Sequence, residues 1–211
     1  MLLGAAMLLA GCEPTAPVRD CSGCTYDFAD TIPPDTILVF HWPGNRLPVR
    51  FYADPRGAMP ALVSLGIATW EGEFLYGELT GVRVSDSSQA DIIVYWPAGV
   101  PPDVPPDAGP PMDACGGTTT NPVSAFVPPV DSTVLHVGLI AKAGFSDAQV
   151  AACLRRVVIH ELGHALGLIK HSPYPEDIMN VVPVVTTPSP EDRRTITVLY
   201  HTAATVTPPP R

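Results

Sequence analysis

The sequence has few basic residues, and no apolar run in it is long enough to cross a membrane. Lysine and arginine together number 12 among 211 residues, against 21 acidic residues, so the formal net charge is −9. An acidic chain without a basic cluster is a poor match for the phosphates of nucleic acids. The apolar run at residues 1–11 falls short of the roughly 20 residues that a membrane-spanning helix needs. We therefore expect neither nucleic-acid binding nor a transmembrane helix.

Charged residues as a whole are also scarce. They make up 16% of the chain, whereas hydrophobic residues make up 46%. This balance excludes disorder caused by low hydrophobicity and high charge, and the chain is long enough for one domain with a sizeable core. Proline, in contrast, is abundant, with 26 residues where about 5% of a chain is usual. Because proline interrupts helices, a long helical bundle is excluded.

The N-terminus is typical of an export signal. Residues 1–11 form an uncharged apolar run with the length of a signal-peptide core. The segment LAGC at residues 9–12 resembles the bacterial lipobox, in which a signal peptidase cuts before a cysteine that carries lipid. We therefore expect a lipid on Cys12 as the sole membrane attachment, in a bacterial cell envelope. Glu13 stands where an aspartate would favour the inner membrane, so we expect the outer membrane or the cell surface.

Proline placement divides the rest of the chain, since proline is excluded from helix interiors and central strands. Two long proline-free stretches, 61–96 and 130–172, should contain most of the regular structure. Apolar and β-branched patterns predict strands at 47–52, 82–84, 91–96 and 134–140, and a helix at 61–76. By composition we predict a tether at residues 12–36, the folded domain at 37–206 and a tail at 207–211.

Residues 97–129 contain ten prolines, and a stretch of this kind predicts a long loop that is functional or disordered. Its acidic residues Asp103, Asp107 and Asp113 offer oxygen ligands, so calcium binding is a second interpretation of the loop. Their spacing, however, fits no compact calcium-binding loop.

A helix with a clear start follows the last predicted strand. Residues 146–149 form a capping box, and apolar residues then continue to Gly167, which suits a helix C-terminus. His160 and His164 lie one turn apart on the same side of this helix, so both imidazoles can reach one metal ion. Glu161 is the next residue round the helix and can approach a water on that metal without becoming a ligand. Zinc held by neutral imidazoles with an open position is a hydrolytic centre at neutral pH.

The continuation of this motif is more specific. The segment HELGHALGLIKHS at residues 160–172, followed by Asp-Ile-Met at 177–179, resembles the matrixin branch of the metzincin zinc endopeptidases. The resemblance implies that Gly167 ends the active-site helix, that a third histidine beyond it completes a site for one zinc ion, and that Met179 forms a Met-turn beneath the metal. Further segments that carry the resemblance lie at 41–50, 68–70, 90–94 and 189–200, within residues 38–201.

The family usually places its third ligand at the position that is Lys170 here, and a histidine follows one residue later. We predict that His171 is the third ligand and that one residue is inserted after Gly167. A protonated lysine repels a dication, whereas a neutral imidazole is a preferred zinc ligand. The eight-residue interval from His171 to Met179 matches the matrixin interval and places the insertion before His171. A site with two histidines, and His171 in solvent, is the alternative.

The resemblance predicts an α+β fold with a twisted, mostly parallel sheet that carries two long helices. A zinc cleft would separate this part from a small irregular C-terminal part that ends in a third helix, and nearly all strands should precede Ser146. The implied protein is a monomeric zinc endopeptidase whose protein or peptide substrate pairs with an edge strand, for which we take residues 134–140. Glu161 would be the catalytic base.

Two other functions are compatible with parts of this pattern. The first is a zinc-binding surface lipoprotein that keeps the protease fold without cleaving, against which the retained Glu161 argues. The second is a gluzincin-type peptidase with a downstream glutamate ligand, but Glu191 stands in no fitting motif.

The four cysteines other than Cys12 are expected to form two disulfides, because an exported chain meets an oxidising compartment. Cys153 lies seven residues before the first histidine of the motif, on the same stripe of the predicted helix, and should be buried. We predict that it pairs with Cys115, so that the proline-rich loop is attached to the helix, and that Cys21 pairs with Cys24. A zinc half-site at Cys21 and Cys24 is the alternative, although the chain has no second pair of this spacing.

Overall fold

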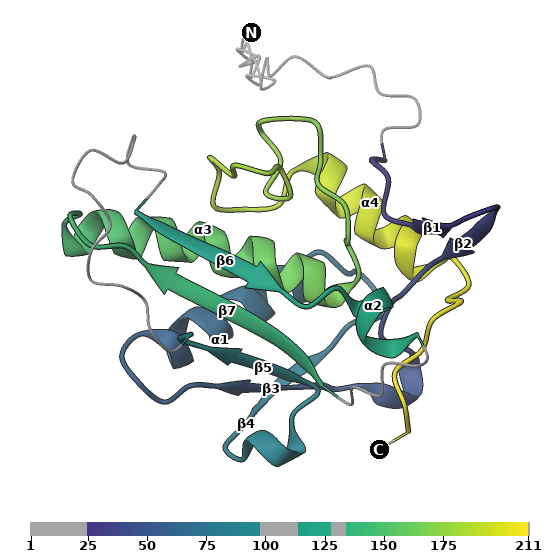
Figure 1. The fold of residues 1–211 in the computed structure, drawn as a ribbon, viewed down its shortest axis with the longest axis horizontal. Helices are drawn as coiled ribbons and strands as arrows, with labels where there is room; N and C mark the ends of the chain where they lie inside the picture. The colour runs from purple at the N-terminus through teal and green to yellow at the C-terminus, as the bar shows by residue number, and fades with distance from the viewer. Residues whose placement is uncertain (1–24, 98–113, 128–133, 211) are drawn as a thin grey trace, which may run out of the picture.

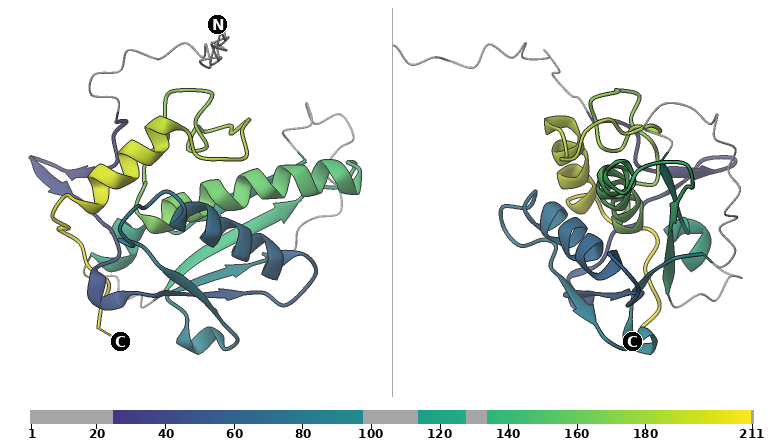
Figure 2. Two further views of the ribbon diagram at one scale, coloured as in Figure 1. Left: turned by 180° about the vertical axis from the view of Figure 1, so that it is seen from behind. Right: turned by 90° about the vertical axis from the view of Figure 1, so that its left-hand side faces the viewer.

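A computed structural model describes residues 25–97, 114–127 and 134–210 of the chain. A twisted five-stranded sheet carries two helices, α1 (Met59–Glu71) and α3 (Asp147–Leu166), on one of its faces (Figures 1 and 2). A third long helix, α4 (Pro190–Tyr200), lies on the far side of α3 from the sheet and follows an irregular segment. The predicted α+β fold is thereby confirmed.

The sheet is parallel except for one edge. Its strand order is β4 (Gly81–Val84), β3 (Val49–Ala53), β5 (Ile92–Tyr95), β7 (Leu135–Ala141) and β6 (Cys115–Thr119). The first four strands run parallel, and β6 pairs antiparallel with β7. The smaller elements are a hairpin of β1 (Asp30–Ile32) and β2 (Thr36–Leu38), the short helix α2 (Pro122–Phe126), and 3-10 turns at Gly44–Arg46 and Ser87–Gln89. Every strand in the described ranges precedes Ser146, as expected.

Close packing fixes α3 against α1. Gly66 of α1 faces Leu162 of α3, and a Cβ at this glycine would lie 2.6 Å from Leu162 Cδ1, so a larger residue would force the leucine to shift. The indole N–H of Trp70 donates to the main-chain oxygen of Ile159 over 2.8 Å. Both Trp70 and Leu162 are fully buried. The helix that carries the His-Glu motif is therefore held along its inner face by close contacts.

The structure corrects the prediction of the edge strand. Residues 134–140 were expected at the edge, but the strand they contain, β7, lies between β5 and β6. The edge next to α3 is β6, which falls inside the stretch 97–129 that the sequence predicts as a loop (Figure 1). Helix α2 belongs to the same stretch. The loop prediction was therefore wrong for the described residues 114–127.

The predicted domain boundaries also change. Tyr26 is buried, its hydroxyl donates to Asp192 over 2.8 Å, and its N–H donates to Thr195 Oγ1. The predicted tether at 12–36 therefore extends too far, because its described part packs against α4. At the other end Pro209, in the predicted tail, accepts a hydrogen bond from Arg46 through its carbonyl oxygen.

No helix within the described ranges is both long and apolar enough to cross a bilayer.

Candidate metal centre

Helix α3 begins and ends where its local sequence dictates. The Ser146 hydroxyl accepts from the N–H of Gln149, and the Gln149 side chain accepts from the N–H of Ser146, which completes the predicted capping box. The helix stops at Gly167, whose φ of 121° is a conformation that side-chain-bearing residues rarely adopt. A Cβ at Gly167 would also collide with the main-chain oxygen of Phe40. The chain can therefore turn back at this point and pass over the helix.

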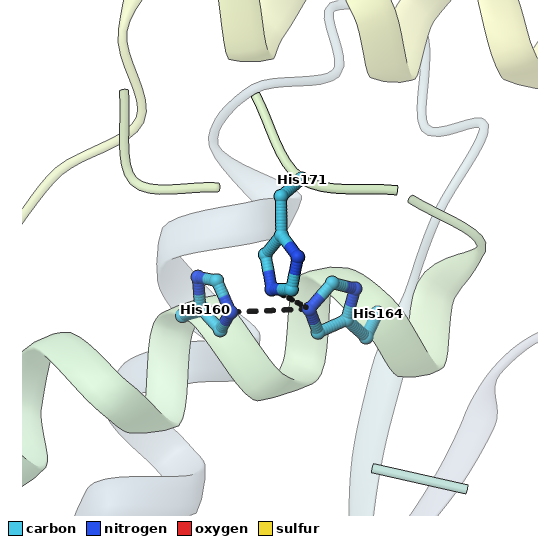
Figure 3. A group of neighbouring side chains, drawn as sticks. All are labelled: His160, His164 and His171. Atoms are coloured by element: carbon cyan, nitrogen blue, oxygen red, sulfur yellow. Dashed lines mark hydrogen bonds between the residues drawn. The ribbon is translucent and has the colours of Figure 1, made fainter. Parts of the chain in front are cut away.

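Three histidines converge above α3. His160 and His164 project from the helix, and His171 reaches down to them from the loop that follows it (Figure 3). Nε2 of His164 lies 3.1 Å from Nε2 of His160 and 3.3 Å from Nε2 of His171. One ligand nitrogen from each ring lies within 4.8 Å of the others, as a single metal ion requires.

The hydrogen bonds made by Nδ1 of His160 and His164 leave the Nε2 atoms of these rings suited to bind a metal. Nδ1 of His160 lies 2.8 Å from the carbonyl oxygen of Ile178, and Nδ1 of His164 lies 2.6 Å from that of Leu168. A carbonyl oxygen only accepts, so each Nδ1 carries the ring proton and each Nε2 presents a lone pair. Lone pairs 3.1 Å apart repel unless a cation lies among them. The donor set therefore fits zinc, which prefers imidazole nitrogen and this arrangement of outer partners.

Burial keeps these histidines neutral. It lowers the pKa of His160 to about 4 and that of His164 to about 3, against an ordinary value near 6.5. Burial also lowers the pKa of His171, which is the most exposed of the three. Neutral imidazole is the form that binds a metal, so at pH 7 the group is ready to do so.

The register follows the prediction that His171, and not Lys170, joins the group. Nζ of Lys170 lies 3.0 Å from Asp30 Oδ1 in the β1–β2 hairpin and forms an ion pair there. The N–H of Ser172 donates to the main-chain oxygen of Met179 over 2.8 Å. This bond ties the residue after His171 to the Met-turn, so the loop is fixed immediately beside the third histidine.

Glu161 lies next to the histidines and is bound to the edge strand. The Thr119 hydroxyl of β6 lies 2.6 Å from Glu161 Oε2, to which it can donate. Burial raises the pKa of Glu161 to about 7, while the bond from Thr119 acts in the opposite direction. Gly117 leaves space for this carboxylate, since a Cβ at that position would lie 2.6 Å from Oε1. A base with a pKa near the working pH is well suited to proton transfer.

Met179, the residue of the predicted Met-turn, packs against the helix that carries His160 and His164, and a residue not predicted from the sequence binds its main chain. Met179 is fully buried and contacts α3 at Gly163, where a Cβ would collide with its sulfur. Asp192 of α4 accepts from the N–H of Ile178 over 2.7 Å and from that of Met179 over 3.3 Å. Asp192 also caps α4, where it accepts from the N–H of Ser189, so one carboxylate binds both the helix start and the Met-turn.

The remaining predicted residues divide into two groups. Cys115 and Cys153 form a disulfide, which joins the start of β6 to α3 as the predicted pairing requires. The others lie outside the described residues, and the structure does not test them: Cys12, Cys21, Cys24, Asp103, Asp107 and Asp113. Thr119 and Gly117 of β6 were missed, because a glycine-rich strand has no apolar alternation to reveal it.

Comparison with known proteins agrees with this geometry. The family model described as matrixin matches residues 67–201, which include the end of α1, most of the sheet, the histidine group and α4. A comparison with curated proteins finds none that matches. The match covers more than half of the chain, and the residues that it spans hold three histidines in a group that fits zinc. The chain therefore belongs to the matrixin family of metallopeptidases.

Proposed function

We propose that this protein is a zinc-dependent endopeptidase in which Glu161 activates the water that attacks the peptide bond. The observation that carries the proposal is the juxtaposition on α3 of three neutral imidazoles and a buried carboxylate. Zinc, when bound by His160, His164 and His171, would polarise the scissile carbonyl and lower the pKa of water to about 7.

Glu161 would transfer the protons of the reaction. Its raised pKa allows it to take a proton from the attacking water and then pass it to the leaving amine. Thr119 binds Oε2, which leaves Oε1 as the oxygen for this transfer. The same Thr119 oxygen also lies 3.0 Å from the main-chain oxygen of Glu161, so β6 contacts both the backbone and the side chain of the base.

The edge of β6 would bind the substrate backbone. A cavity of about 310 Å³ lies between this strand and the histidines, and its lining includes Gly117, Thr118, Thr119, Glu161 and His171. β6 pairs with β7 on one side only, so its other edge can receive an extended peptide as a further strand. Such pairing places a peptide bond beside Glu161 whatever the side chains of the substrate.

We further propose that the mature protein is anchored by lipid at Cys12, in the outer membrane or at the surface of a bacterial cell. The support is the signal-like run at 1–11 and the lipobox-like segment at 9–12.

The test is the variant Glu161→Gln, assayed on a mixed peptide library with and without a zinc chelator. We expect cleavage to fall by about 100-fold or more, since a positioned base contributes that much, while metal analysis still finds zinc bound. Glu176→Gln, which changes an exposed carboxylate in the segment between His171 and Met179, should keep both properties. Undiminished cleavage by Glu161→Gln would exclude it as the base, and a wild-type protein that binds zinc but cleaves nothing would establish the non-cleaving alternative.

A further inference from the structure

A second cavity opens beside the histidines, on the side of the first turns of α3. Its volume is about 270 Å³, room for a substrate side chain when one water molecule takes about 30 Å³. Three segments supply most of its lining: the start of β6, α3 with Arg156 and Val157, and the chain after the Met-turn with Val181 and Val182. His160, Glu161 and His171 complete it, so the cavity is continuous with the candidate metal centre.

Arg156 supplies a cation to this cavity. It lies four residues before His160, one helical turn away, so both side chains are on the same face of α3. No carboxylate in the described residues forms an ion pair with Arg156, and its side chain is only partly exposed. The carboxylate in the cavity lining belongs to Glu161, which is engaged with Thr119. The guanidinium is therefore available to a carboxylate from outside.

The direction of β6 indicates which substrate residue enters the cavity. β6 starts at Cys115, bonded to Cys153, and ends at Thr119, bonded to Glu161, so it runs alongside α3 in the same direction. Antiparallel strand pairs outnumber parallel ones two- to three-fold. A peptide antiparallel to β6 passes Glu161 and then moves toward the Cys115 end, so the residue after the scissile bond meets the cavity.

We propose that Arg156 selects an acidic side chain, aspartate or glutamate, in the residue that follows the cleaved bond. This inference rests on the proposed endopeptidase function. Arginine binds carboxylates through two parallel N–H groups, and hydrogen bonds between charged partners are about twice as strong as neutral ones. Val157, Val181 and Val182 line the cavity and offer contact to the methylene groups of the side chain.

The test compares two peptides that differ only in glutamate or glutamine after the scissile bond. We expect kcat/KM to favour the glutamate peptide by about tenfold or more, the effect of one hydrogen bond to a charged group. Arg156→Met should bring the ratio to about one, Arg156→Lys should retain part of it, and Arg156→Glu should invert the preference toward a lysine peptide. Arg155→Met is the matched control, because Arg155 is exposed and lines a different cavity between α1 and α3.

A binding measurement separates this proposal from the proposed function. In the Glu161→Gln protein, which should not cleave, the dissociation constant of the glutamate peptide should be about tenfold lower than that of the glutamine peptide. Equal rates and equal affinities for the two peptides would overturn the role of Arg156 while leaving the endopeptidase intact. Cleavage of neither peptide, nor of the mixed library, would contradict the endopeptidase itself.

Discussion

At the scale of single residues, Lys170 and His171 are neighbours with opposite surroundings. The lysine points to the β1–β2 hairpin and pairs with Asp30, whereas the histidine points to α3 and meets two other imidazoles. The sequence favours His171 over Lys170 as the third metal ligand, because an ammonium group repels the cation that an imidazole binds. The one residue inserted after Gly167 therefore leaves His171 beside the other two histidines, and the Lys170 side chain points away from them.

His171→Ala should weaken zinc binding by more than about 100-fold and abolish cleavage, because it removes one of three nitrogen ligands. Lys170→Ala should leave both near normal, since it breaks only a partly exposed ion pair. Competition with a chromogenic chelator gives the zinc affinity directly. The opposite ranking of the two variants would show that the register is wrong.

The histidines also make the metal-free protein sensitive to acid. Their pKa values lie at about 4 for His160 and about 3 for His164, below the ordinary 6.5 that they regain on unfolding. Below pH 6.5 the unfolded chain binds protons that the folded chain does not, so stability falls as the pH drops toward 4. Urea unfolding of chelator-treated protein at pH 7 and pH 5 should show this loss. His160→Gln/His164→Gln should lose less stability between pH 7 and pH 5 than the wild-type protein. Equal losses in the variant and the wild type would contradict this explanation.

At the scale of secondary-structure elements, β6 is joined to α3 at two points. The disulfide from Cys115 to Cys153 ties its start, and the hydroxyl of Thr119 binds Glu161 at its end. Between them Gly117 faces the carboxylate without a side chain. The edge that would receive a substrate is thus fixed to the helix that carries the metal ligands.

Removing this disulfide should cost the domain stability. The two cysteines are 38 residues apart, and closing a loop of this length contributes roughly 2–4 kcal/mol. We expect Cys115→Ser/Cys153→Ser to unfold at lower temperature and lower urea concentration, with reduced peptide cleavage because β6 is less well held. Cys21→Ser/Cys24→Ser, predicted to break only a local bond, is the control. A larger loss of stability in this control would contradict the predicted pairing of Cys21 with Cys24.

Elements with local signals were predictable from the sequence, and those defined by distant contacts were not. Helix α3 has its capping box and Gly167 in its own sequence, so its start and end were both predicted. Strand β5 is an apolar run and was predicted for the same reason. β6 reads Cys-Gly-Gly-Thr-Thr, has weak strand propensity, and is defined by pairing with β7 and by the bond to α3.

The site shows the same division. His160, His164 and Glu161 follow from spacing along one helix, and His171 follows from the resemblance to the matrixins, so a sequence displays all four directly. The partners that orient them come from distant segments: Thr119 from the sheet edge and Asp192 from the last helix. Such contacts depend on packing between elements, and a single sequence carries no local pattern for them.

At the scale of the whole molecule, the N-terminal segment is joined to the floor of the site. Tyr26 donates to Asp192, which in turn accepts from the N–H groups of Ile178 and Met179. A lipid at Cys12 would therefore hold the membrane close to a segment that is already packed on the domain. The anchor itself stays a prediction from the sequence.

Cys12→Ser should release the protein from membranes, because acyl chains contribute about 0.8 kcal/mol for each buried methylene. The released protein should keep its zinc and its cleavage of peptides, since no described contact of the site involves residue 12. Fractionation of cells into soluble and membrane parts, with mass spectrometry of the mature N-terminus, checks this. An unmodified N-terminus at another residue in the wild-type protein would disprove the anchor.

The loop between α3 and His171 has a consequence for recognising relatives of this protein. Its start is fixed by Gly167 and its end by the bond from Ser172 to Met179, while Lys170 turns outward between them. An additional residue can be accommodated here without displacing a ligand. A search pattern with a rigid gap between the second and third histidines would miss this chain and every other with the same insertion. A pattern that leaves this gap variable and fixes the distance from the third histidine to the methionine would retrieve them.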